Sequence, residues 1–76
     1  MRKKTVNNLV TMHNRVCRLC NQIAEVDSYE VEDDFTEKEK KTLKEIRKKA
    51  DDLLLEIYAF KKKALDDRGI PIPDVL

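Results

Sequence analysis

Residues 36–68 read TEKEKKTLKEIRKKADDLLLEIYAFKKKALDDR, and this stretch decides the fold. Its apolar residues recur at alternating intervals of three and four, the a/d pattern of a helix that packs along one side. The residues of this stripe are Leu43, Ile46, Ala50, Leu53, Ile57, Phe60 and Ala64. A helix of this length extends about 50 Å. The stripe therefore needs an equally long partner.

Both ends of this helix carry recognisable signals. Thr36 and Glu39 form a capping box, in which each side chain accepts a backbone N–H of the other residue. Gly69 suits the left-handed position after a helix, and Pro71 cannot continue one. We predict a helix over 36–68.

The segment before it predicts a second, shorter helix. Residues 1–4 form a basic leader, and Thr5 can serve as the N-cap of a helix over 5–27. An a/d stripe runs through Leu9, Met12, Val16, Leu19, Ile23 and Val26. A second row beside it holds Val6, Val10, His13, Cys17, Cys20 and Ala24. An apolar arc this broad indicates contact from more than one side.

The region over 28–35 is acidic and lacks helical periodicity, which indicates a connection. It is either a solvated linker or an acidic docking motif anchored by Tyr29, Val31 and Phe35. A connection of this length lets the helices fold back antiparallel. Because the first helix is shorter, we expect it to end near Tyr58 and leave the last turns of the second helix uncovered.

The predicted fold is all-α: one domain over 1–76, an antiparallel two-helix hairpin followed by an extended tail over 69–76. The tail contains Pro71 and Pro73, which disfavour helix. A chain of 76 residues rarely buries enough core by itself. A lone hairpin cannot bury a broad face on both helices, whereas two hairpins in a four-helix bundle can. We therefore expect a homodimer.

Composition narrows the function classes. Charged residues make up 41% of the chain, but 16 basic and 15 acidic residues leave a net charge of only +1. This balance gives no overall field to attract nucleic acid or an anionic membrane. No apolar run approaches the length of a membrane span. The two cysteines fit reduced thiols better than a disulfide framework, so we expect a cytoplasmic location.

The candidate chemistry is limited to three side chains. His13, Cys17 and Cys20 project from one helix face and are competent metal ligands. Zinc sites use four ligands, usually drawn from two elements, so buried thiols beside a partly buried imidazole are the favoured interpretation. We see no phosphate loop, oxyanion loop or orienting carboxylate. We expect neither enzymatic activity nor a cofactor.

The favoured function is that of a small protein–protein interaction module, such as a regulator, an inhibitor or an assembly factor of phage or mobile-element type, acting as a helical homo-oligomer. Its partner is not identified by any motif. The candidate partner-binding residues are Leu54, Leu55, Tyr58, Phe60, Leu65, Ile70 and Ile72. The alternative is a nucleic-acid-binding dimer that uses the basic face formed by Lys40, Lys44, Arg47 and Lys48. No aromatic platform for base stacking accompanies these lysines.

Overall fold

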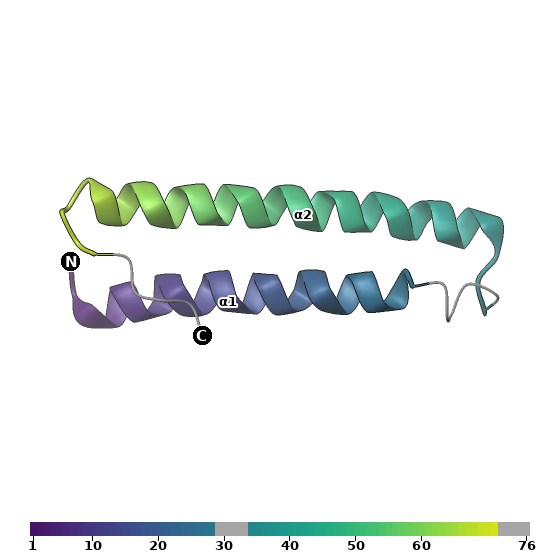
Figure 1. The fold of residues 1–76 in the computed structure, drawn as a ribbon, viewed down its shortest axis with the longest axis horizontal. Coiled ribbons are helices and arrows are strands. Elements are labelled where there is room, and N and C mark those ends of the chain that lie inside the picture. Colours follow the sequence, from purple (N-terminus) through teal and green to yellow (C-terminus); the bar gives the residue numbers. More distant parts are fainter. Residues whose placement is uncertain (29–33, 72–76) are drawn as a thin grey trace.

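The computed structural model describes residues 1–28 and 34–71 of the chain. Over these residues it contains two helices, α1 (Lys3–Val26) and α2 (Glu37–Asp66). The helices lie side by side and antiparallel (Figure 1). The predicted all-α two-helix hairpin is therefore confirmed. No helix in the described ranges is long and apolar enough to cross a membrane.

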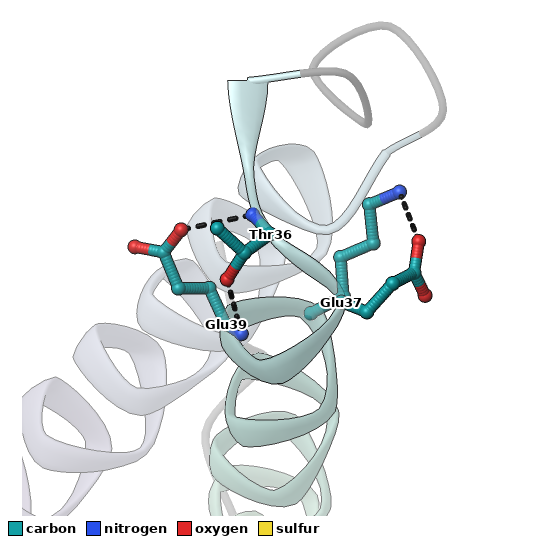
Figure 2. Close-up of polar contacts among 4 residues, drawn as sticks. Thr36, Glu37 and Glu39 are labelled. Atoms are coloured by element: carbon teal, nitrogen blue, oxygen red, sulfur yellow. Dashed lines mark hydrogen bonds and ion pairs between the residues drawn. The ribbon is translucent and has the colours of Figure 1, made fainter.

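The start of α2 is fixed by the predicted capping box. The Glu39 backbone N–H donates to Thr36 Oγ1 over 3.1 Å, and the Thr36 N–H donates to Glu39 Oε1 over 2.9 Å (Figure 2). Two hydrogen bonds with Thr36 lower the pKa of Glu39. The bond from the Thr36 backbone N–H has the larger effect, and the bond with the Thr36 side chain has the smaller one. Local sequence alone therefore specifies where α2 begins.

The end of α2 is a Schellman motif, as the Gly69 signal suggested. Gly69 has φ of +64°, in the left-handed region that glycine enters without a Cβ penalty. The Ile70 N–H donates to the Leu65 carbonyl over 2.9 Å, and the Gly69 N–H donates to the Asp66 carbonyl over 3.0 Å. These bonds satisfy carbonyls that the helix end would leave free.

The start of α1 differs from the prediction. Arg2, not Thr5, is the N-cap, and no side chain caps this helix. The Thr5 N–H instead donates to the Arg2 carbonyl over 3.0 Å. Helices in proteins are stabilised mainly by packing, so the basic leader does not stop α1 from extending to Lys3. The other helix ends lie one or two residues inside the predicted ranges 5–27 and 36–68, within normal variation.

The predicted overhang at the end of α2 is wrong. α1 has 24 residues and α2 has 30, but the surplus lies at the connection end, where α2 starts beyond the end of α1 (Figure 1). Lys61 and Leu65, near the other end of α2, are 1% and 0% exposed. The contacts of His13 with Lys61 and of Cys20 with the Ala50 carbonyl set this register, and the N-terminal end of α1 lies level with the end of α2 (Figure 1).

Two predicted features fall largely outside the described ranges. They are the docking motif, with Tyr29 and Val31, and most of the tail, including Ile72 and Pro73. At the edges of the described parts, Phe35 and Ile70 are half-buried and Pro71 is exposed.

Candidate interaction surface

Two residues from the second row of α1, His13 and Cys20, contact α2 in the seam between the helices. The buried His13 contacts Lys61 of α2, and the Cys20 thiol donates to the Ala50 carbonyl over a 3.5 Å Sγ–O distance. At the connection end, Arg47 forms an ion pair with Asp27 over 3.1 Å. The inner seam, defined by these six residues, therefore mixes polar and charged groups with small side chains.

A buried polar cluster closes the seam near the end of α2. Lys61 Nζ lies 2.8 Å from His13 Nδ1 and 5.7 Å from the centroid of the Tyr58 ring. The rings of His13 and Tyr58 have their centroids 5.5 Å apart. A lysine ammonium can only donate, so His13 Nδ1 accepts and its ring proton sits on Nε2. Burial, and then the positive charge of Lys61, lowers the pKa of His13.

Two of the three predicted metal ligands, His13 and Cys20, make other contacts in the seam. His13 Nδ1 is used by Lys61, and the Cys20 thiol is directed at a backbone carbonyl. Burial, followed by the negative charge of Asp51 and then by Cys17, raises the pKa of the Cys20 thiol. Among the described residues, no three His, Cys, Asp or Glu side chains are gathered so that they could hold a metal ion. Both cysteines are free thiols.

Large apolar side chains lie outside the seam. On α2, Ile46, Leu53 and Phe60 are exposed at intervals of seven residues, and Phe60 is 61% exposed. On α1, Met12 and Leu19 are exposed with the same spacing, and the half-buried Val26 continues it. Seven residues are almost two full helical turns, so each set forms one straight stripe.

The two stripes lie on the same side of the hairpin. Val26 of α1 and Ile46 of α2 border one hollow of about 330 Å³ near the connection. The other residues that line this hollow are Phe35, Lys38, Glu39, Thr42 and Leu43. Since Val26 ends one stripe and Ile46 begins the other, the hollow joins them. We call the combined surface the open face; it consists of Met12, Leu19, Val26, Ile46, Leu53 and Phe60.

The open face is arranged in three levels. The contacts of His13 with Lys61 and of Cys20 with Ala50 fix the antiparallel register. Extending this register along both helices places Met12 about level with Phe60, Leu19 with Leu53 and Val26 with Ile46. The hollow lies at the level next to the connection, whereas the highly exposed Phe60 lies at the far level.

The residues predicted to bind a partner are distributed over different sides of α2. Leu65 is fully buried, while Leu54 and Ile70 are half-buried. Leu55 is 67% exposed, but it lies five residues from Phe60, which places the two side chains about 140° apart around the helix. Tyr58 is partly exposed and belongs to the buried polar cluster. Of the predicted residues that the structure describes, only Phe60 therefore contributes to the open face.

Five residues of the open face were missed as candidates: Met12, Leu19, Val26, Ile46 and Leu53. Their signal was present, because all five belong to the two a/d stripes of the sequence. The stripe of α2 is divided lengthwise: Ala50 is buried, whereas Ile46 and Leu53 remain exposed. The seven-residue repeat divides each stripe into two rows, but only the contact between the helices determines which row is outermost.

The predicted basic face is partly neutralised. Lys40 lies 3.3 Å from a Glu37 carboxylate oxygen (Figure 2), and Arg47 is paired with Asp27 in the inner seam. Lys44 and Lys48 are exposed and four residues apart, so they share one side of α2.

Comparison with known proteins gives no relative: no family model, curated protein or solved structure matches this chain.

Proposed function

We propose that the chain is a non-enzymatic protein–protein interaction module that acts as a homodimer and joins two hairpins into a four-helix bundle. The observation that supports this proposal is the open face. Five large apolar side chains on one side of a small hairpin remain exposed to water, while a lysine and a histidine occupy the seam. Burial of apolar surface drives association, and contiguous exposed patches mark interaction sites.

The size of the chain adds to this proposal. Among the described residues, only Ala50 and Leu65 are buried apolar side chains. A core this small offers little to offset the conformational entropy lost on folding. Covering the open face with another chain supplies the missing burial. A regulator, inhibitor or assembly factor can act through such helix packing alone, without a catalytic or metal site.

Light scattering tests the proposal. The purified chain should have a mass of twice 8.9 kDa at micromolar concentration. Leu53→Glu should convert it to a monomer, because a carboxylate in a buried interface loses its hydration without gaining a partner. Leu55→Glu is the matched control: it makes the same change on the same helix, outside the open face, and should leave the mass unchanged. A folded monomer at all accessible concentrations would contradict the proposal.

Nucleic-acid binding through Lys40, Lys44, Arg47 and Lys48 is the alternative function. The exposed pair Lys44 and Lys48 favours it, while the ion pairs of Lys40 and Arg47 oppose it. Mobility shift over a salt series separates the two functions. Binding that weakens steeply with salt would support the alternative, since it reports released counterions. Absence of a shift at low salt would exclude it.

A further inference from the structure

We propose that the open face docks a second copy of this chain with the two connections at opposite ends of the bundle, so that α2 crosses the partner's α2 at Leu53. This inference rests on the proposed homodimer and specifies its geometry. A two-fold dimer buries the same patch of both copies. Two hairpins stacked through the open face can place their connections at the same end or at opposite ends.

Shape favours opposite ends. The open face has a hollow at the connection end, bordered by Val26 and Ile46, and the protruding Phe60 at the other end. A two-fold axis at the level of Leu53 brings the partner's Phe60 to Ile46, where it can enter the hollow. Both hollows are then filled, each by an aromatic anchor of the kind that dominates binding energy.

The same-end arrangement lacks this fit. It stacks α1 of one copy on α2 of the other without reversing the levels. Phe60 then meets the partner's Met12, and each hollow faces the partner's hollow. Since the lining of an unfilled space loses its packing contacts, this arrangement leaves the connection end of the interface poorly packed.

Charge adjoining the open face is compatible with opposite ends, as it is with the same end, and offers a way to distinguish the two arrangements. Lys49 and Glu56 are exposed and flank Leu53 on the outer edge of α2, four residues before it and three after it. Reversal about Leu53 places Lys49 beside the partner's Glu56, and the symmetry makes this pair twice. The corresponding positions on α1 are Arg15 and Gln22, which meet each other without like-charge conflict.

The same charges distinguish the two arrangements. With connections at the same end, Lys49 would face the partner's uncharged Gln22, and Glu56 would face the partner's Arg15. Lys49→Glu therefore creates two repulsive pairs only in the opposite-end dimer. There it should raise the dimer Kd roughly tenfold, which corresponds to modest losses at two exposed pairs. Adding Glu56→Lys should restore the Kd in the opposite-end dimer and weaken the same-end dimer.

Cross-linking gives the direct test. In a Cys17→Ser, Cys20→Ser background, Leu53→Cys should form a disulfide-linked dimer on mild oxidation, because Leu53 lies beside the partner's Leu53 at the two-fold axis. Leu55→Cys, directed away from the open face, should not. Circular dichroism checks that each variant is folded.

The outcomes separate this inference from the proposed function. A dimeric mass together with disulfide formation at Leu53→Cys, and Kd values that follow the Lys49 and Glu56 charges, supports the opposite-end geometry. In the same-end dimer Leu53 would lie beside the partner's Leu19, so Leu19→Cys in the same background serves as a comparison. A dimeric mass with cross-links only between Leu53→Cys and Leu19→Cys chains, or with no response to Lys49→Glu, overturns the geometry and retains the homodimer. A monomeric mass for the unmodified chain overturns both.

Discussion

The inner seam and the open face reverse the usual distribution of polar and apolar groups. The seam buries His13 and Lys61, whereas the open face leaves Leu19, Leu53 and Phe60 in contact with water. A buried ammonium is costly unless it is well paired, and exposed large apolar groups forgo their burial energy. The hairpin is thus not the arrangement that a self-sufficient monomer would favour.

This difference assigns separate tasks to the two surfaces. Small side chains in the seam, such as Ala50 and Cys20, let the helices approach closely, and the hydrogen bond from Lys61 to His13 fixes one register. Specificity of register is a recognised role of buried polar groups. The open face has the larger apolar side chains and, in the proposed homodimer, supplies the burial that remains. The predictions below test whether the surfaces really differ in this way.

The largest effect on folding is expected at the most buried apolar residue of the hairpin. Leu65→Ala should lower the free energy of unfolding by about 2–5 kcal/mol, the range for deleting a buried leucine side chain. Leu55→Ala, at the exposed position, should change it by less than about 0.5 kcal/mol. Urea unfolding at one fixed protein concentration measures both. Equal losses would remove the distinction between inside and outside.

A smaller loss is expected from overfilling the seam. Ala50 is buried, and its carbonyl accepts the Cys20 thiol. Ala50→Leu should cost about 1–3 kcal/mol, because added methylenes force the helices apart. Ala59→Leu, the same change at an exposed site on α2, is the control and should be nearly neutral. If Ala50→Leu were tolerated equally well, the seam would not be closely packed.

The start of α2 outruns α1, so it depends on its cap more than on the seam. Thr36→Ala removes the acceptor of the Glu39 N–H and should cost about 1 kcal/mol. Thr36→Ser keeps a hydroxyl and should retain most of the stability. Thermal unfolding followed by circular dichroism compares the two variants. A full loss with serine would show that the Thr36 methyl group, and not the hydrogen bond, stabilises this end.

The mildest effect is a pH dependence confined to the seam. His13 has a folded-state pKa below its ordinary value of 6.5, so the unfolded chain binds the proton more readily. Its contribution to stability is therefore complete above pH 6.5 and is lost as the pH falls through the lower folded-state pKa.

Unfolding free energies measured from neutral to mildly acidic pH should decline for the natural chain. His13→Gln keeps an acceptor for Lys61 but does not titrate, so its curve should be flatter over the same range. Identical slopes for the two chains would mean that His13 is not held in its neutral form by the seam.

The features that could be predicted from sequence are local. Thr36 with Glu39 and Gly69 with Pro71 state where α2 begins and ends, because caps depend on neighbouring residues. The a/d stripes indicated two helices and a broad apolar arc on the first. These signals are sufficient for the all-α hairpin.

The remaining features depend on how the helices meet. Nothing adjacent to Lys3 marks the start of α1, because that end has no side-chain cap. The register that buries Lys61 arises from its contact with His13, 48 positions apart, which periodicity does not reveal. For the same reason the sequence did not show that Leu65 is covered and that Leu53 is open.

Sedimentation equilibrium of the natural chain and of Leu53→Glu over a range of micromolar concentrations tests the central claim most directly. We predict a monomer–dimer equilibrium with a mass approaching twice 8.9 kDa for the natural chain, and an 8.9 kDa species at every concentration for Leu53→Glu. A natural chain that sediments as a folded monomer throughout would contradict the claim that the open face is an interface.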